Sequence, residues 1–453
     1  MKSSSLRWCS LFGLAAIAGL ACSGGGGGRK NPTDTGGSGG EEETGGSPGT
    51  GGAKPGTGGK AGGSGGSTGG SGGSTGGAGG SSGGSGGGDT GGAGGSTGGA
   101  GGSVSMGTKS KLVTLDTTPT GANVMGNVDK YPVAINLSAA NFDFASAKDK
   151  GADLRFSTMD GAPLPYAIES WDSAAKLAAV WVKVDVKGNS KQTIKMTWGD
   201  PAASDASDSK KVFDTAEGWA GAWHLAEPGN TMPGGYKDAT GNAADASQKA
   251  TSAAGSAPGR IGPALSLSSA MMQYLQVDGG VDKNKVFDMP DHMTYSIWVN
   301  PKSHTVEYQC MFSKGEGGFR IHFYGAADWT ENKGKNIVEM CAEGTQSNDM
   351  CPVAPGKTDV AIGKWTLITA VHDKPKLTLF INGAQEATLS INEVWKSDAT
   401  KAVSIGNNSS NLKRAFDGLL DEARVLNVSK DANWVKLDFQ SQKEGSTFVT
   451  FGQ

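Results

Sequence analysis

Short runs of apolar and aromatic residues recur over most of the chain, and glycine, asparagine or aspartate separates them. Residues 179–186 (AVWVKVDV) alternate well enough to form a strand with one buried face. Comparable runs predict strands at residues 111–115, 131–137, 178–186 and 193–198. We therefore expect an antiparallel β-sandwich over residues 104–205.

A second series of runs predicts a larger β-domain over residues 206–453. Its strands are expected at residues 222–225, 273–277, 293–299, 319–323, 365–371, 377–381, 402–405 and 418–425. Asn382 and Gly383 directly follow one of these runs, and Asn-Gly favours the tight turn of a β-hairpin. About eight short strands over ~200 residues fit a double-sheet jelly roll. A short helix is expected at residues 431–440.

The first hundred residues lack this pattern. More than half of the 75 glycines lie between Gly24 and Gly102, and the nonamer GGSTGGAGG occurs at residues 72–80 and again at 94–102. Because this segment has almost no apolar side chains to bury, it cannot offset the entropy of ordering. We expect residues 22–103 to form a disordered, glycine-rich tether with an r.m.s. span of about 50 Å.

Residues 1–21 are typical of an export signal of the lipoprotein type. Lys2 and Arg7 precede an apolar run at residues 11–21 that is too short to span a bilayer as a helix. Small residues lead to Cys22, which favours a lipid on that cysteine and an outer-membrane location, either periplasmic or at the cell surface. Secretory cleavage near Ala21, which gives a secreted protein, is the alternative.

The net charge limits the expected classes of binding partner, and the cysteines predict one disulfide. The net charge of -3 offers no electrostatic footprint for nucleic acid, and contact with a membrane is expected through the lipid anchor alone. In an oxidising compartment one disulfide is expected, either Cys341 with Cys351 or Cys310 with one of these two. Metal binding by the three cysteines is the weaker reading, because they lack CxxC spacing.

Ordered motifs in the upstream half resemble a bacterial extracellular β-domain family of unknown function. They are YPV at 131–133, GADLRF at 151–156, DG at 160–161, LPY at 164–166, IESW at 168–171, WVKV at 181–184 and WGD at 198–200. Members of that family commonly precede a laminin-G-like, concanavalin-A-like jelly roll. The resemblance implies an all-β chain in which a β-sandwich is followed by such a jelly roll.

The downstream half resembles that jelly roll. The motifs are AWHL at 222–225, DATGN at 238–242, SIWV at 296–299, KW at 364–365, LFING at 379–383 and FDGLLDEARV at 416–425. The resemblance implies a fold and hardly any activity, because jelly rolls of this kind serve glycan-binding, protein-binding and structural roles.

The sequence offers only weak candidates for catalytic residues. Asp421 and Glu422 are adjacent on an expected strand, so we expect their side chains to point to opposite faces, where they cannot flank one glycosidic bond. His224 lies beside Trp223 at a strand, and we interpret it as a structural histidine. We expect a protein that is not an enzyme.

A calcium site is the most specific ligand site that the sequence predicts. Residues 238–242 (DATGN) form an oxygen-rich loop that suits Ca²⁺. In related jelly rolls the acidic residue of the last strand approaches this loop, so the resemblance implies a structural calcium ion at Asp238 and Asp421. The alternative is that Asp238 and Asn242 form a hydrogen-bonded turn while Asp421 pairs with Arg424.

Two tryptophans are candidates for ligand contact. Trp329 and Trp395 lie in polar surroundings, and an exposed indole beside acidic and amide groups suits a sugar ring. The alternative is that each indole folds back onto its own domain. The leading hypothesis is a non-catalytic, envelope-anchored module that binds glycan or another extracellular polymer. A structural or adhesive protein-protein module is the second hypothesis, and an unrecognised glycan hydrolase is the third.

Overall fold

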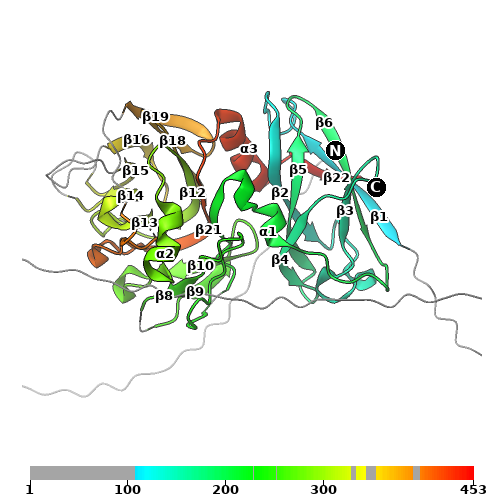
Figure 1. Ribbon diagram of the computed structural model, residues 1–453, viewed down its shortest axis with the longest axis horizontal. Coiled ribbons are helices and arrows are strands. Elements are labelled where there is room, and N and C mark those ends of the chain that lie inside the picture. The colour runs from blue at the N-terminus through cyan, green and yellow to red at the C-terminus, as the bar shows by residue number, and fades with distance from the viewer. Residues whose placement is uncertain are drawn as a thin grey trace, which may run out of the picture. The chain divides into compact units, whose positions relative to one another are not determined.

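Two β-domains lie side by side in the computed structural model (Figure 1). The structure describes residues 108–227, 229–250, 252–327, 333–342, 353–390 and 398–452. Strands dominate both domains, and the helices among the described residues are short. The all-β class expected from the alternating runs is therefore confirmed.

The upstream domain is a sandwich of two antiparallel sheets. Its strands are β1 (Lys109–Asp116), β2 (Val128–Ser138), β3 (Arg155–Thr158), β4 (Tyr166–Asp172), β5 (Leu177–Val186) and β6 (Lys191–Trp198). One sheet has the order β2-β5-β4, and the other contains β1, β6 and β3. The centre of β5 is buried on both faces, because one face packs on the sandwich core and the other meets the downstream domain.

The downstream domain packs two larger sheets face to face. The first has the order β19-β18-β17-β12-β21-β10-β9, with β7 also paired to β21. Its strands are β7 (Trp219–Trp223), β9 (Gly255–Pro258), β10 (Pro263–Leu267), β12 (His292–Pro301), β17 (Thr366–Asp373), β18 (Lys376–Ile381), β19 (Ala384–Ser390) and β21 (Gly418–Leu426). The expected turn joins β18 to β19, since Asn382 and Gly383 both have positive φ, as a type I′ hairpin requires.

The second sheet of this domain has the order β16-β15-β14-β13-β20-β11-β8. Its strands are β8 (Ala246–Gln248), β11 (Leu275–Val277), β13 (Cys310–Ser313), β14 (Phe319–Gly325), β15 (Lys335–Ala342), β16 (Val353–Asp359) and β20 (Ser404–Ile405). Apolar side chains from the facing surfaces of both sheets form the jelly-roll core, which includes Trp223, Tyr295 and Phe319. The expected jelly roll is confirmed.

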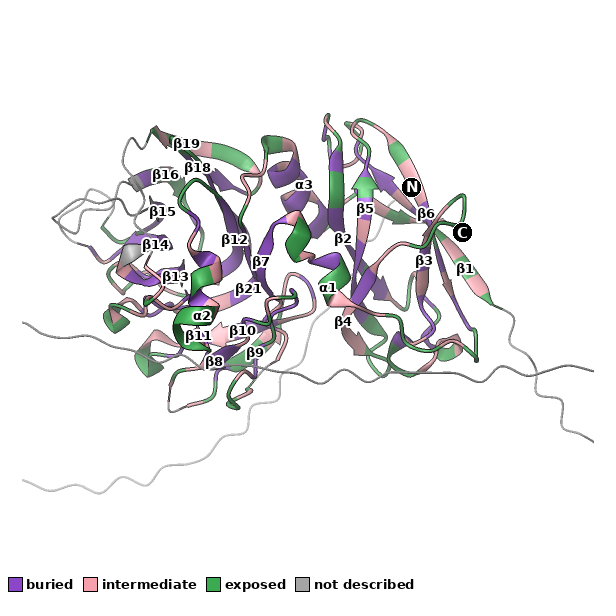
Figure 2. Ribbon diagram, viewed as in Figure 1, coloured by how far each residue is buried: buried purple, intermediate pink, exposed green. Residues whose placement is uncertain are grey.

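A second apolar core joins the two domains. It combines sandwich residues such as Trp181 with Leu426 of β21 and with Trp434 of the downstream chain. Helices α1 (Ser209–Val212) and α2 (Gly280–Asn284) are short, whereas α3 (Ala432–Gln442) is the helix expected from the sequence. Figure 1 shows α3 between the two domains, and Figure 2 shows that buried residues continue through this region.

The C-terminal segment returns to the upstream domain. Strand β22 (Val449–Phe451) pairs antiparallel with β1 and completes a sheet of order β22-β1-β6-β3. Phe448, just before it, is fully buried in the core that the domains share. The upstream sandwich therefore contains the last strand of the chain, which the alternating runs did not predict. No helix in the described ranges has the length and apolar character needed to cross a membrane.

Candidate functional site

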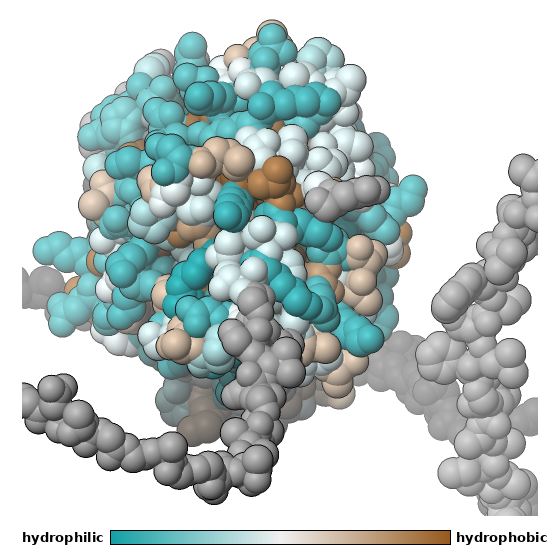
Figure 3. All heavy atoms as spheres, turned by 90° about the vertical axis from the view of Figure 1, so that its right-hand side faces the viewer, coloured by the Kyte–Doolittle hydropathy of each residue, from teal (hydrophilic) through white to brown (hydrophobic). Residues whose placement is uncertain are grey.

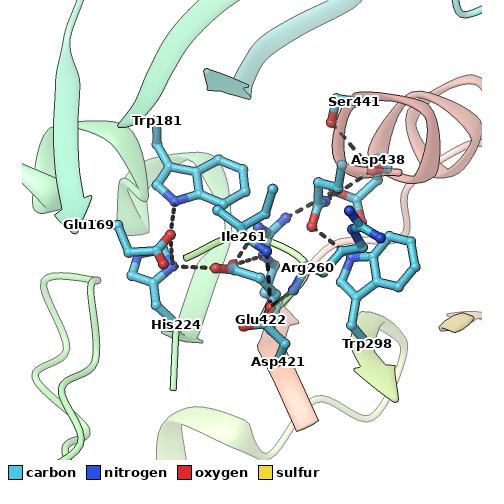
Figure 4. A network of polar contacts seen from close by, with 12 residues as sticks. Glu169, Trp181, His224, Arg260, Ile261, Trp298, Asp421, Glu422, Asp438 and Ser441 are labelled. Atoms are coloured by element: carbon cyan, nitrogen blue, oxygen red, sulfur yellow. Dashed lines mark hydrogen bonds and ion pairs between the residues drawn. The ribbon is translucent and has the colours of Figure 1, made fainter. Parts of the chain in front are cut away.

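A network of polar contacts lies at the interface between the domains (Figure 4). A buried arginine of this network, Arg424 on β21, bonds to acidic side chains. Its Nε and Nη2 donate to Oε2 of Glu422 at 3.0 and 2.5 Å, and its Nη1 donates to Oδ1 of Asp438 on α3 at 2.9 Å. Its guanidinium carbon lies 4.5 Å from the centre of the Trp181 ring on β5. A planar, forked cation fits this set of partners, whereas a lysine ammonium would not.

His224 links the ion cluster of the downstream domain to a glutamate of the upstream domain. Its Nδ1 lies 2.8 Å from Oε1 of Glu422 and 3.5 Å from Oε2 of Glu169, which belongs to the upstream domain. The imidazole stacks on Trp181 with 5.7 Å between ring centres, and the Trp181 indole N–H donates to Glu169 Oε2 at 2.7 Å. His224 is thus a structural histidine, as its sequence setting suggested.

The cluster shifts the pKa values of its carboxyl groups in opposite directions. Burial opposes ionisation of Glu422, but His224 and Arg424 lower its pKa to about 2. Burial raises the pKa of Glu169 well above its usual value, and burial and the Glu422 charge do the same for Asp421. Burial disfavours the imidazolium, but Glu422 and Glu169 outweigh it and raise the pKa of His224 to about 9. The pKa values of Glu169 and Asp421 are therefore shifted upward and that of Glu422 downward within one cluster.

One sequence expectation is wrong: Asp421 and Glu422 point to the same face. Glu422 has a φ of 50°, and the register of β12 against β21 shifts so that Ile297 opposes two residues. This β-bulge places both acids toward the interface, while Leu420 and Ala423 enter the jelly-roll core. The sequence signal is the spacing of the core residues at 420, 423 and 425, which breaks the period of two.

The turn between β9 and β10 approaches these acids closely. Arg260 and Ile261 donate their backbone N–H groups to Oδ2 of Asp421 at 2.6 and 3.1 Å. A Cβ atom on Gly262, whose φ is +56°, would lie 2.4 Å from Oε1 of Glu169. This turn therefore requires glycine where the upstream domain packs on it.

The calcium prediction is not tested by these contacts and stays a prediction. Oδ1 of Asp238 accepts from the N–H groups of Ala222 and Thr240, and Oδ2 accepts from Ala244 N–H and the Thr240 hydroxyl. Asp421 bonds to the β9–β10 turn instead. Asp238 therefore forms a hydrogen-bonded turn, as the alternative expected, but with Thr240 in the place considered for Asn242. The other half of the alternative is wrong, because Arg424 pairs with Glu422 and Asp438 and not with Asp421.

Glu169, His224 and Glu422 form the one cluster of three metal-ligand side chains found among the described residues, with ligand atoms within 4.8 Å of one another. One imidazole and two carboxylates is a donor set that suits zinc. Arg424 already binds Oε2 of Glu422, and the side chains of both glutamates are 1% exposed. A small-molecule substrate cannot reach groups buried to this degree. The arrangement is that of an ion cluster that holds two domains together.

A cleft of about 690 Å³, the interdomain cleft, opens beside this cluster. Its upstream wall includes Asn136, Ser170, Trp171 and Leu177, and its downstream wall consists of residues 256–258, Gly262 and Pro263. Leu177 is 56% exposed. The Trp171 ring packs on Phe142 and Phe144, with ring centres 5.6 and 5.1 Å away. Trp171 thus lines the cleft together with small polar groups, and two neighbouring rings fix its indole.

Three neighbouring polar residues form a row on the outer face of the seven-stranded sheet, and the sequence did not predict this row. Cys310, His322 and Glu339 are direct neighbours across β13, β14 and β15. His322 Nε2 lies 3.2 Å from Glu339 Oε2, an ion-pair distance without hydrogen-bond geometry. Burial lowers the pKa of His322 and raises that of the Cys310 thiol to about 11. A protonated, fully buried thiol is not a nucleophile.

Several predicted residues lie outside the described part of the chain. Trp329 and Trp395 fall there, as do Cys22 and Cys351, and for Cys341 the backbone alone is described. The ligand-binding and lipidation assignments and the Cys341–Cys351 disulfide therefore stay predictions, whereas Cys310 is a free, buried cysteine. Trp171, which lines the interdomain cleft, was not among the candidates because it lies in a family motif that was read as fold alone.

Comparison with known proteins agrees with the architecture. Residues 273–436 match the family model described as the concanavalin A-like lectin/glucanases superfamily, and residues 150–225 match the Domain of unknown function (DUF2341). A comparison with curated proteins gave no match.

Solved structures share parts of the fold. Domain 4 of AbnA, a GH43 extracellular arabinanase from Geobacillus stearothermophilus in complex with arabinotriose, is 17% identical over 49% of this chain and 98% of that one, with a TM-score of 0.38. The binding domain of Paraclostridial Mosquitocidal Protein 1 is 13% identical over 50% of this chain and 52% of its own, with a TM-score of 0.37. The receptor binding domain of botulinum neurotoxin type G is 13% identical over 50% of this chain and 51% of its own, with a TM-score of 0.35.

The chain spans about half the length of these two toxin domains. The likenesses concern the fold. Together, the family matches and the two β-domains show that this chain pairs a DUF2341 domain with a concanavalin A-like jelly roll of the laminin-G type.

Proposed function

We propose that this chain is an exported, non-catalytic recognition module that binds a glycan chain in the interdomain cleft. The observation that carries the proposal is the fixed indole of Trp171 in the wall of a cleft of about 690 Å³. A sugar ring presents a C–H face that packs on an indole and a rim of hydroxyls that hydrogen-bond to small polar groups. Asn136, Ser170 and Ser256 supply such groups along the same walls.

The rigidity of the interface supports this use of the cleft. Glu169 and Trp181 of the upstream domain contact His224 and Arg424 of the downstream domain, and α3 packs between the domains. A cleft whose two walls are already locked loses little conformational entropy when a ligand binds. The ion cluster therefore serves binding indirectly, by fixing the distance between the walls.

The acids near the cleft support a module without hydrolytic activity. A glycosidase needs two carboxyl groups on either side of the scissile bond. Asp172 is the one carboxylate among the described residues that line the interdomain cleft, and its Oδ1 accepts from Ala175 N–H at 2.8 Å. Glu169, Asp421 and Glu422 lie behind the walls and are paired there.

Affinity electrophoresis of the full chain tests the proposal. The protein is run through native gels that contain arabinan, xylan, polygalacturonate, laminarin or a cellulose derivative. We expect retardation by at least one polysaccharide, and we expect Trp171→Ala to weaken it by about tenfold in Kd, since aromatic contacts of this kind contribute roughly 1 kcal/mol or more.

Ile362→Ala is the matched control, because Ile362 is 48% exposed and lines a different cleft of the downstream domain. Unaltered mobility in every gel would overturn the glycan proposal. Equal effects of Trp171→Ala and Ile362→Ala would move the site away from the interdomain cleft.

A protein partner is the second candidate function. Strand β9 lies at the open edge of its sheet and its residues 256–258 line the interdomain cleft, so an extended peptide could add to it. Cross-linking that captures one protein at β9, together with silence in all polysaccharide gels, would favour this candidate over a glycan.

Attachment to the outer membrane through Cys22 completes the proposal. Cys22→Ser should release the protein from the membrane fraction, and the unaltered chain should take up a labelled fatty acid. A soluble, unlabelled wild-type chain would favour secretion instead.

A further inference from the structure

A second cleft adjoins the interdomain cleft on the upstream domain. This loop cleft has a volume of about 420 Å³ and is lined by residues 139–145, Lys111, Lys176 and Trp198. It lies within the upstream domain, whose surface is hydrophilic with small apolar patches in the view of Figure 3. Neither the jelly-roll family nor the proposed function accounts for it.

The two clefts meet at the tip of the β4–β5 hairpin. Lys176 lines the loop cleft, and Leu177, the next residue, lines the interdomain cleft. Consecutive Cα atoms are 3.8 Å apart, so the two clefts come within one residue of each other at this ridge. The hairpin tip is exposed from Asp172 to Leu177, and a chain-like ligand can pass over it.

One aromatic cluster supports both clefts. Phe142 lines the loop cleft and packs on Trp171 of the interdomain cleft, with ring centres 5.6 Å apart. Trp198, which lines the loop cleft, packs on the other side of Phe142 at 4.7 Å. The walls of both clefts are therefore parts of one rigid assembly, so the spacing between them is fixed.

The charges of the two clefts differ. In the loop cleft, Asp143 is paired with Lys109 at 2.5 Å, while Lys111 donates to the Asn141 carbonyl and Lys176 makes no ion pair with a described residue. Two ammonium groups thus remain without a carboxylate partner. In the interdomain cleft Asp172 is the one charged side chain. A carboxylate on the ligand is favoured in the loop cleft and disfavoured in the interdomain cleft.

We propose that the two clefts are consecutive subsites for one linear acidic polysaccharide, which crosses the β4–β5 hairpin. This inference rests on the proposed function and names the ligand class and the second subsite. A sugar ring packs on Trp171 in the interdomain cleft, and a uronic acid further along the same chain places its carboxylate between Lys111 and Lys176. A chain that fills both subsites gains affinity over one that fills a single subsite.

The test measures binding of the full chain to oligogalacturonates from the disaccharide to the decasaccharide by isothermal titration calorimetry. We expect affinity to rise steeply with length and then to level off once both clefts are filled. Lys176→Glu should weaken oligomers of every length about tenfold or more, because the carboxylate is favoured in the loop cleft and even the disaccharide occupies that cleft. Trp171→Ala should weaken only the oligomers long enough to reach the interdomain cleft. High salt should weaken binding at every length, because it screens the ammonium-carboxylate contact.

Lys187→Glu is the matched control, since Lys187 is also an exposed lysine of the upstream domain and lines neither cleft. Thermal unfolding of each variant shows whether it is folded. Affinity that does not depend on length, or equal effects of Lys176→Glu and Lys187→Glu, would overturn the two-subsite inference. Retention by neutral polysaccharides with silence toward polygalacturonate would overturn the acidic assignment and leave the proposed function standing. Silence toward all polysaccharides would remove both.

Discussion

Single residues at the interface carry charges that water does not reach. Arg424 and Glu422 are each 1% exposed, and Asp438 is fully buried. Such an ion pair adds little net stability over an apolar pair, but removing one partner leaves a buried charge without compensation. The interface is therefore highly sensitive to the loss of any one of these groups.

Glu422→Gln tests this sensitivity. We expect the free energy of unfolding at pH 7 to fall by about 3 to 5 kcal/mol in urea denaturation, because His224 and Arg424 lose their shared anion. Glu444→Gln is the control, since that side chain is 87% exposed and 3.4 Å from Arg260. Its effect should stay below about 1 kcal/mol. Losses of equal size in the two variants would show that the buried cluster is not critical.

The pH dependence of stability follows from His224. Its pKa rises from 6.5 in the unfolded chain to about 9 in the folded one, so its contribution is fully present below pH 6.5 and is lost as the pH rises to 9. Unfolding measured from pH 6 to 10 should show wild-type stability falling over this window. His224→Gln should lack that part of the slope, and an unchanged slope would contradict the ion cluster.

At acidic pH, the change in stability with pH is expected to come mainly from Glu422. Its pKa is lowered from 4.5 to about 2, so its contribution is present above pH 4.5 and is lost as the pH falls toward 2. Glu169 and Asp421 act in the opposite direction, because their raised pKa values favour the folded state at low pH. Unfolding of Glu422→Gln measured from pH 2 to 5 should lack the Glu422 contribution, and it should also show a smaller upward pKa shift of Asp421 and Glu169, because the Glu422 charge helps to raise both.

Residue patterns predicted some of this site. The structural role of His224 followed from its strand context, but its partners Glu169 and Glu422 lie in a different domain or on a distant strand. No local pattern relates positions 169, 224 and 422. The prediction that the Asp421 and Glu422 side chains point to opposite faces was wrong. It assumed a regular strand with alternating faces, and the bulge at Glu422 interrupts that alternation.

Among the elements, the β9–β10 turn shows how backbone shape determines the interface. Gly262→Ala should destabilise the protein by at least about 1 kcal/mol more than Gly161→Ala. Both glycines have positive φ, so both variants share the conformational strain. A Cβ on Gly161 meets nothing within 4 Å, whereas a Cβ on Gly262 meets Glu169. Thermal unfolding measures the difference, and equal shifts would show that the turn is not closely packed.

Periodicity predicted the elements with local signals. The alternation of β5 and the Asn-Gly hairpin between β18 and β19 are encoded within a few residues. Strands β8 and β9 were missed because they are short and polar. The ranges expected from the sequence also leave out β3, β4, β10, β13, β15 and β16. Strand β22 was missed because its partner β1 lies more than three hundred residues away, and pairing at that distance leaves no local mark.

The whole molecule shares one core between its two family domains. Apolar residues from β2, β5, β21 and α3 form a single cluster, and β22 belongs to the upstream sheet although it follows the jelly roll. The upstream family match extends to residue 225 and includes β7, which pairs with β21 of the jelly roll. The shared cluster lies beside the separate core of the jelly roll. Each domain should depend on the other for its stability.

Differential scanning calorimetry of the full chain should therefore give one cooperative transition, with equal calorimetric and van't Hoff enthalpies. Phe448→Ala should lower this whole transition by about 3 to 5 kcal/mol, because it opens a cavity in the shared core. Thr450→Ala, two residues later on an exposed position, should change it little. Two separate transitions would show that the domains unfold independently.

The pairing of β22 with β1 also has a mechanical meaning. A load that reaches the folded unit from its N-terminal side enters along β1 at Lys109, and β1 lies between β6 and β22. Its ladder with β6 runs from Lys109 to Asp116, so a pull along the strand shears all of those hydrogen bonds at once. A protein held at one end while its ligand drags at the other would thus resist extension where the chain is doubly braced.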